Sequence, residues 1–225
     1  MGSKELKVCQ RDLMPLERYA RTLGITLDKG QLDQFELYTT ELLEWNRRIN
    51  LTGLKTKEEV VVHHHMDSIT PGRYLLETKR LMDFGTGAGF PGIPLKIAMP
   101  DIELYLVEAR RKKLSFLRNV VLSLSLDNVH LCHGRVEDKM FCEEHRESMD
   151  TVITRAALKV RQVLDAGHVI VREGGRIVIM KGAMRPQEVR EIESFMSQHG
   201  TKGIETLPYT LPGMERERYL IVVTR

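Results

Sequence analysis

The sequence is poor in several features that define common classes of protein. Its 225 residues include three cysteines, an odd number without C-x-x-C spacing, which argues against a disulfide framework and against a zinc site. These are Cys9, Cys132 and Cys142. No apolar run approaches the ~20 residues that a membrane-spanning helix requires, and the first residues lack the apolar stretch of a secretion signal. We therefore expect a cytoplasmic protein with no membrane segment.

A strong excess of one charge is also missing. The net charge of +3 is too small to indicate a nucleic-acid-binding protein by itself. Basic residues are nevertheless unevenly distributed: residues 155–190 hold eight basic and three acidic side chains, and residues 110–113 read Arg-Arg-Lys-Lys, followed by Arg118. These two segments either bind phosphates or are ordinary solvated faces.

The spacing of apolar residues predicts two kinds of region. Residues 1–75 have helical periodicity, with Asp28 as a candidate N-cap, and we expect them to form an N-terminal helical extension. Residues 76–225 alternate between strand-like and helical segments, which predicts a doubly wound, mainly parallel α/β sheet. The predicted strands are residues 81–84, 104–108, 129–133, 151–154, 176–180 and 219–223. Between them we expect a helix whose apolar face includes Val160 and Val171, another that begins at Pro186 and ends at Gly200, and a surface loop at residues 139–149.

The most informative segment is the glycine-rich turn after the first predicted strand. Residues 83–94 read D-F-G-T-G-A-G-F-P-G-I-P, so Asp83 stands two residues before Gly85, and the spacing is G-x-G-x-G rather than G-x-G-x-x-G. The binding of a pyrophosphate would not be favoured by the Asp83 carboxylate, because both groups carry negative charge. The ammonium and sulfonium of S-adenosylmethionine would be favoured by it. A tight turn without a ligand is the alternative interpretation of Gly85, Gly87 and Gly89.

Two further strand ends suit the same cofactor. Glu108 ends the second predicted strand, where an acid can bind ribose hydroxyls, although it could also be a surface acid. Val136 and Glu137 come after the third strand, where a loop N–H and a carboxylate can bind an adenine edge. Together these features predict an S-adenosylmethionine-dependent methyltransferase. A noncatalytic nucleotide- or RNA-binding module and a small-molecule methyltransferase are the rival hypotheses.

The residues at the end of the fourth predicted strand bear on the methyl acceptor. The sequence has no Pro-Pro dipeptide, which is common where exocyclic amines are methylated, and no Pro-Cys dipeptide, which often supplies the nucleophile for pyrimidine C5 methylation. The strand instead ends Thr154-Arg155-Ala156-Ala157. Because Arg155 offers a guanidinium rather than a base, we expect an acceptor that is already nucleophilic, such as a ring nitrogen.

Several motifs together resemble the RsmG family, also called glucose-inhibited division protein B. They comprise Trp45-Asn46, Asn50-Leu51-Thr52, the H-x-x-D-S pattern of residues 64–68, residues 83–94, residues 111–118, Arg135-Val136-Glu137, Thr154-Arg155-Ala156, Lys181-Gly182 and Glu217-Arg218-Tyr219-Leu220. One departure is His63-His64 where relatives often have Arg-His. The resemblance implies a class I (Rossmann-like) methyltransferase that forms 7-methylguanosine in bacterial 16S ribosomal RNA, at guanine 527 near the decoding site.

The resemblance also assigns site residues. It implies cofactor contacts at Gly85, Phe90, Val136, Glu137 and Arg155, and it suggests Glu108 for the ribose; the glycine turn adds Asp83 and Gly87. Guanine presents N7 and O6 as acceptors, so a cation can hold O6 while the N7 lone pair stays free. We assign that catalytic role to Arg155 and Lys181, and substrate contacts to Asn50, His64, Arg135 and Lys181.

Some of these residues have alternatives. Asn50 is either a helix cap or a substrate contact, and His64 either packs between the two regions or binds RNA. Asp67 is expected to bond backbone or loop groups where the regions meet, or to act directly. The three consecutive histidines lack a ligand-spaced acid or cysteine, so we expect no metal. The expected protein is a monomer whose partner is 16S ribosomal RNA, with a small-subunit assembly intermediate as one expected form of the substrate.

Overall fold

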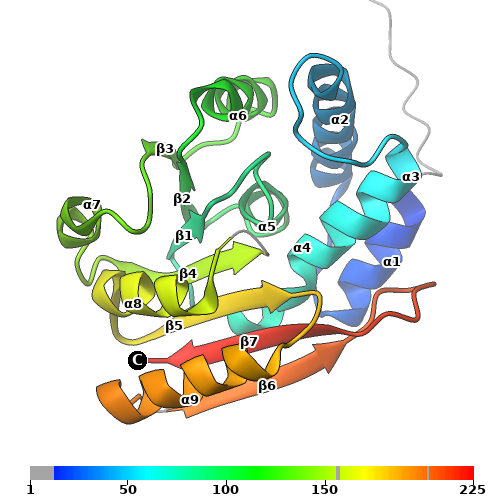
Figure 1. The fold of residues 1–225 in the computed structure, drawn as a ribbon. Helices are drawn as coiled ribbons and strands as arrows, with labels where there is room; N and C mark the ends of the chain where they lie inside the picture. The colour runs from blue at the N-terminus through cyan, green and yellow to red at the C-terminus, as the bar shows by residue number, and fades with distance from the viewer. Residues whose placement is uncertain (1–12, 156–157, 202) are drawn as a thin grey trace, which may run out of the picture.

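The protein is built around one seven-stranded sheet (Figure 1). The computed structural model describes residues 13–155, 158–201 and 203–225, so Cys9 and Ala156-Ala157 lie outside the described residues. The strands are β1 (Arg80–Phe84), β2 (Glu103–Glu108), β3 (Val129–His133), β4 (Met149–Arg155), β5 (Val171–Lys181), β6 (Gly203–Tyr209) and β7 (Arg218–Thr224). Their spatial order is β3-β2-β1-β4-β5-β7-β6, and β7 runs antiparallel to both of its neighbours. This is the doubly wound, mainly parallel sheet that the sequence predicts.

Helices cover both faces of the sheet (Figure 1). The first part of the chain forms α1 (Met14–Thr22), α2 (Lys29–Asn46), α3 (Lys57–Val60), η2 (Val61–Met66), α4 (Asp67–Ile69) and η3 (Thr70–Tyr74). The helices between the strands are α5 (Gly92–Ala98), α6 (Arg111–Ser123), α7 (Lys139–Glu144), α8 (Val160–Ile170) and α9 (Pro186–His199). Alternate strand residues point to opposite faces. Leu81 and Leu104 pack with the N-terminal helices, α5 and α6, whereas Met82 and Tyr105 pack with α8 and α9. Among the described residues, none of the helices has both the length and the apolar character needed to cross a bilayer.

The N-terminal helices are tied to the sheet through α2. Asp28 caps α2 in a reciprocal arrangement with Gln31, as the sequence predicts. Further along α2, the Tyr38 hydroxyl donates to the Ala88 carbonyl at 2.6 Å, and Trp45 packs edge-on against Phe116 at a ring-centroid distance of 5.7 Å. The first of these contacts joins α2 to the turn between β1 and α5. The N-terminal helices therefore share one core with the sheet and reach its carboxyl edge.

Three local expectations are wrong. The sequence does not predict strand β6, because it is an edge strand with exposed residues and contains Pro208, which is tolerated only at such positions. Residues 139–149 are not simply a loop, because Asp138 caps the short helix α7. Val171 does not belong to the helix that contains Val160; it is the first residue of β5, because α8 ends at Ile170.

Candidate active site

The glycine-rich turn joins β1 to α5 at the carboxyl edge of the sheet. Gly85 and Gly87 both have φ of +64°, a conformation that a residue with a Cβ atom rarely adopts. Gly89 has φ of +99° and a further role, because a Cβ atom there would lie 2.5 Å from Cδ1 of Ile93 and 2.8 Å from the hydroxyl oxygen of Tyr38. All three glycines thus shape the turn, and Gly89 also allows it to pack against α2.

Asp83 lies beneath this turn and is fully buried. Its Oδ2 accepts hydrogen bonds from Oγ1 of Thr86 at 2.6 Å and from the Gly92 N–H at 2.9 Å. Burial raises the pKa of this carboxyl to about 6, and the two hydrogen bonds oppose that rise. Within the described part of the chain, Oδ1 of Asp83 has no hydrogen-bond partner. A buried acceptor without a partner suits a cationic ligand group above the turn.

Glu108 at the end of β2 completes one wall of a cavity of about 250 Å³. Its two carboxylate oxygens accept from the Gly87 N–H at 3.1 Å and the Arg110 N–H at 2.8 Å. Glu108 is only 7% exposed, so it is not a surface acid. The cavity is lined by Gly85, Val107, Glu108, Ala109, Arg110, Lys113, Gly134, Arg135, Val136, Glu137 and Leu158. It brings together the predicted ribose and adenine contacts.

Arg155 ends β4 and is held by the N-terminal part of the chain. Its Nη1 donates to the His63 carbonyl and to Oδ2 of Asp67, each at 3.2 Å. Its Nη2 donates to Nδ1 of His64 at 3.0 Å. The guanidinium also lies 5.1 Å from the centre of the Phe90 ring, in a cation–π contact. Two of its five N–H groups, Nε–H and one on Nη2, have no partner among the described residues.

His64 is a neutral acceptor in this arrangement. A guanidinium can only donate, so Nδ1 of His64 accepts from Arg155 although the His63 carbonyl also lies 3.2 Å from it; Nε2 then carries the proton and donates to Oγ1 of Thr52 at 2.8 Å. The ring stacks on Phe90 at a centroid distance of 4.2 Å. Burial, and then the charge of Arg155, lower the pKa of His64 to about 2. The histidine is therefore uncharged near neutral pH.

Asp67 connects three distant segments. It is 1% exposed, and its Oδ2 accepts from Nη1 of Arg155 and from Nη1 of Arg218 at 3.1 Å, while its Oδ1 accepts from the Tyr209 hydroxyl at 2.8 Å. Burial and the nearby Asp67 charge raise the pKa of Tyr209 far above its ordinary value. Asp67 does form its bonds where the two regions meet, as expected, but its three partners are side chains at strand ends rather than backbone or loop groups. The sequence gives no sign of the Tyr209 contact, since Tyr209 belongs to the unpredicted strand β6.

A second cavity, of about 270 Å³, opens beside this cluster at the carboxyl ends of β4 and β5. It is lined by His63, His64, Asp67, Arg155, Met180, Lys181, Gly182, Tyr209 and Arg218. Nζ of Lys181 donates to Oε1 of Glu188 at 2.7 Å, and Oε2 of Glu188 accepts from the Arg185 N–H at the start of α9. The cavity thus has three cationic side chains and one carboxylate in its wall, with a second carboxylate behind Lys181.

Other predicted substrate residues lie elsewhere. Asn50 is exposed. The side chain that bonds the backbone at the end of α2 is that of Asn46, which donates to the Thr52 carbonyl and accepts from the Leu51 and Thr52 N–H groups. Arg135 is exposed on the wall of the cavity beside Glu108. Across residues 13–155, 158–201 and 203–225, no three His, Cys, Asp or Glu side chains are grouped so that they could hold a metal.

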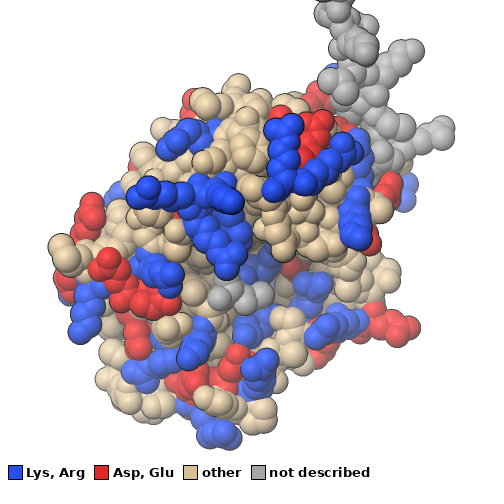
Figure 2. Space-filling view, turned by 45° about the horizontal axis from the view of Figure 1, so that its top comes forward, with Lys and Arg blue, Asp and Glu red and all other residues tan. Residues whose placement is uncertain are grey.

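The basic segment of residues 155–190 does not form one patch. Arg155 and Lys181 lie at the carboxyl ends of their strands, whereas Arg176 pairs with Thr151 at the opposite end of the sheet. Arg172 lies at that opposite end as well, in an ion pair with Asp150. Figure 2 shows Lys and Arg side chains spread over one face, with Asp and Glu side chains between them. A long strand separates residues that are close in sequence, which is why the clustering along the chain is misleading.

Comparison with known proteins places the chain among methyltransferases. A family model described as GidB, rRNA small subunit methyltransferase G, matches residues 31–211. The chain is 38% identical over 207 residues to the ribosomal RNA small subunit methyltransferase G of Lachnoclostridium phytofermentans, an alignment that covers 91% of this chain and 86% of that protein.

Solved structures share the fold at low sequence identity. Precorrin-6y C5,15-methyltransferase from Geobacter metallireducens aligns with a TM-score of 0.56 at 16% identity, covering 78% of this chain and 91% of that one. Fibrillarin from Aeropyrum pernix, solved with natively bound S-adenosyl-L-methionine, aligns with a TM-score of 0.52 at 17% identity, covering 65% and 66%. These likenesses bear on the fold, which is that of class I methyltransferases.

Proposed function

The chain belongs to the rRNA small subunit methyltransferase G family and is an S-adenosylmethionine-dependent methyltransferase; we propose that its acceptor is N7 of a guanine in 16S ribosomal RNA. The family resemblance implies this acceptor. The chemistry of the cavity beside Arg155 and Lys181 supports it as well, because that cavity offers cations to hold an acceptor, and the His64 and Asp67 side chains in its wall are already engaged.

The residues around the glycine turn fit the cofactor. We propose that the unpartnered Oδ1 of buried Asp83 faces its ammonium, with Gly85, Gly87 and Phe90 around its amino-acid end. Glu108 would hold the ribose hydroxyls, and Val136 with Glu137 would bind the adenine edge in the cavity of about 250 Å³. Phe90 also contacts Arg155, which lines the second cavity. When bound, S-adenosylmethionine supplies an electrophilic methyl group on its sulfonium.

The observation that carries the choice of acceptor is the state of the two proton acceptors beside Arg155. His64 uses Nδ1 to accept from Arg155, and its pKa of about 2 makes it a poor base. Asp67 has both oxygens engaged by two guanidiniums and a tyrosine hydroxyl. An exocyclic amine would require a base to take its proton, whereas the N7 lone pair of guanine does not.

We assign Arg155 and Lys181 to the guanine. The free N–H groups of Arg155 and the Lys181 ammonium are donors that suit O6, so they would orient the base and leave N7 unblocked. Catalysis would then consist mainly of orientation, with the reacting atoms held about 3–3.5 Å apart. His64 contributes through Arg155, and Arg135 and Asn50 remain proposed contacts to the RNA.

We further propose that residues 1–75 are an extension packed on a methyltransferase domain of residues 76–225. The enzyme would act as a cytoplasmic monomer on ribosomal RNA, within an assembly intermediate of the small subunit. An unstacked guanine is required, since the reacting ring nitrogen must reach the cavity.

The decisive experiment is methyl transfer from labelled S-adenosylmethionine to small-subunit RNA that lacks this modification, with nucleoside mapping of the product. We expect label in 7-methylguanosine at one position. Label in another nucleoside would overturn the proposed acceptor. If no label is transferred to RNA and small molecules are labelled instead, the result would favour the rival hypothesis of a small-molecule methyltransferase.

A further inference from the structure

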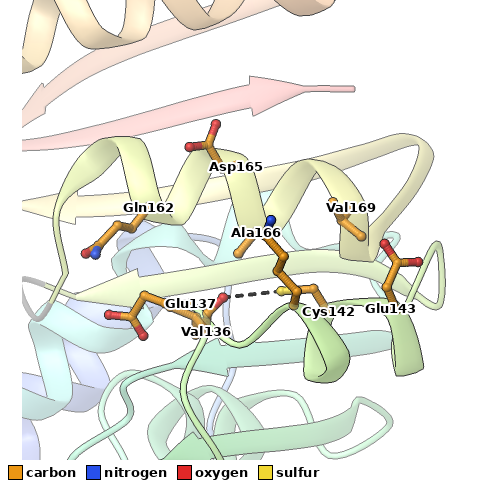
Figure 3. Close-up of a pocket in the computed structure, with 9 residues that line it drawn as sticks. Val136, Glu137, Cys142, Glu143, Gln162, Asp165, Ala166 and Val169 are labelled. Carbon is orange, nitrogen blue, oxygen red and sulfur yellow. Dashed lines mark hydrogen bonds between the residues drawn. The ribbon is translucent and has the colours of Figure 1, made fainter.

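A recess of about 530 Å³ lies between α7 and α8, outside the two cavities of the candidate active site (Figure 3). Its middle is apolar and its rim is polar. The apolar part consists of Val136, Cys142, Ala166 and Val169, and the polar part of Glu137, Lys139, Glu143, Gln162 and Asp165. Figure 3 shows Ala166 above Cys142, with Gln162 and Glu137 at one end of the recess and Val169 and Glu143 at the other. This volume is typical of small-molecule sites.

The recess lies next to the proposed adenine site. Val136 and Glu137 line both the recess and the cavity of about 250 Å³ beside Glu108. The Cys142 thiol donates to the Val136 carbonyl at 3.2 Å, which ties the wall of the recess to the same loop. Glu137 therefore stands between the proposed adenine site and the end of the recess where Gln162 lies.

The recess suits an uncharged apolar group rather than an ion. Asp165 is paired with Arg161, and Glu143 is paired with Arg146, so two of the three rim carboxylates already have cations; the third, Glu137, also lines the proposed adenine site. Burial raises the pKa of the Cys142 thiol, which keeps it protonated near neutral pH. An apolar cavity of about 150 Å³ already accommodates a benzene ring. The recess has room for more than one such ring.

We propose that this recess is an accessory pocket for apolar substituents on the exocyclic amine of an adenosine ligand. The inference rests on the proposed function only in placing adenine at Val136 and Glu137. The exocyclic amine has two hydrogens, so one can remain bonded to the Glu137 carboxylate while a substituent replaces the other. An N6-arylalkyl adenosine derivative then fills both cavities, and the substituent packs between Cys142 and Ala166.

Calorimetric binding tests this with two probes, S-adenosylhomocysteine and its N6-benzyl derivative. The wild-type protein should bind the derivative at least as tightly as the parent compound. Ala166→Leu and Val169→Phe place extra carbon in the recess, so each should weaken binding of the derivative by about tenfold and leave that of the parent unchanged. Val189→Phe makes the same change on an exposed position of α9 and should alter neither affinity.

The outcomes distinguish an error in the proposal for the recess from an error in the proposed cofactor site. If the wild type does not bind S-adenosylhomocysteine, the proposed cofactor site is wrong. If it binds the parent but binds the derivative more than tenfold more weakly, the recess is closed to the substituent and the inference is overturned. Equal affinities for the derivative in every variant would also overturn it, because the substituent would then project into solvent. Parent affinity serves as the fold control, and two different recess variants guard against one failing to fold.

Discussion

Nη2 of Arg155 donates to Nδ1 of His64 at 3.0 Å, although the two residues are 91 positions apart. The bond requires a neutral histidine, because a protonated ring would have a hydrogen on Nδ1 and would repel the guanidinium. Arg155 is thus oriented from the N-terminal helices, while its backbone belongs to β4. Both the pH dependence of stability and the rate of methyl transfer should reflect this contact.

His64 should make stability depend on pH below its ordinary pKa of 6.5. The folded pKa is lowered to about 2, so the unfolded chain takes up the proton first. The stabilisation is complete above pH 6.5 and is lost as the pH falls from 6.5 toward 2. Between pH 6.5 and 5, the wild type should lose about 2 kcal/mol more free energy of unfolding than His64→Gln, whose amide oxygen can still accept from Arg155. Urea unfolding at both pH values measures this; parallel losses would contradict the assignment of His64. His65 and Asp83 titrate in both proteins, so their contributions to the pH dependence of the free energy of unfolding cancel in the comparison.

Arg155→Ala should slow methyl transfer far more than it disturbs the fold. A missing positional constraint can lower the rate by about 10²-fold, and Asp67 keeps its bonds to Tyr209 and Arg218. Arg155→Lys should rescue poorly, since lysine retains the charge without the planar fork. The measurement is single-turnover transfer at saturating cofactor, with thermal melting alongside. The control is Arg161→Ala, a half-buried arginine of α8 that lines neither cavity of the candidate site. A folded Arg155→Ala enzyme with the parent rate would make Arg155 a structural residue.

Gly85→Val and Gly87→Val should each abolish measurable binding of S-adenosylmethionine. The added side chains extend toward the proposed ligand and strain a backbone with φ of +64°. Gly24→Val is a matched control, because Gly24 has φ of +77° at the end of α1 with open space around it. Calorimetry should show unchanged affinity in that variant. Unchanged affinity in a folded Gly85→Val or Gly87→Val protein would mean that the cofactor lies elsewhere.

RNA affinity should fall with increasing salt, and the start of α6 should contribute to that dependence. Arg111 and Lys112 are exposed there. Replacing both with alanine should reduce the slope of log affinity against log salt by about 1.4 to 1.8, the value for two lost phosphate contacts. Arg146→Ala with Arg172→Ala removes two exposed cations at the opposite end of the sheet. Titrations at several salt concentrations should give the wild-type slope for that control; equal slopes in all three proteins would show that the α6 cluster is only a solvated face.

The sequence is sufficient to predict most of the architecture because buried parallel strands have a strong local signal. Five of the seven strands are predicted within two residues at each end, β5 begins five residues before its predicted start, and the glycine turn identifies the proposed ligand-binding edge. Strand β6 has no such signal, since it alternates exposed and half-buried residues and contains Pro208. Its recognition depends on pairing with β7, which is a tertiary contact rather than a local pattern.

The candidate site is less accessible to sequence reasoning. Arg155, His64 and Lys181 can be selected by motif and strand position, and they do line one cavity. Their partners cannot be selected in this way. Nothing near Asp67 in sequence indicates that it bonds Tyr209, 142 positions away, or Arg218, 151 positions away. Similarly, the basic residues of 155–190 look like one cluster until β5 separates them.

The bonds of Asp67 have a consequence for the order in which the protein folds. Bringing together residues that are 142 and 151 positions apart has an entropic cost that contacts between residues close in sequence do not have. The carboxylate can gather its three donors only after β7 has docked against β5 and β6 against β7. The helical segments and the first parallel strands need no such distant partner. We therefore expect the arginine cluster to be completed late in folding, once strands β4 to β7 have assembled.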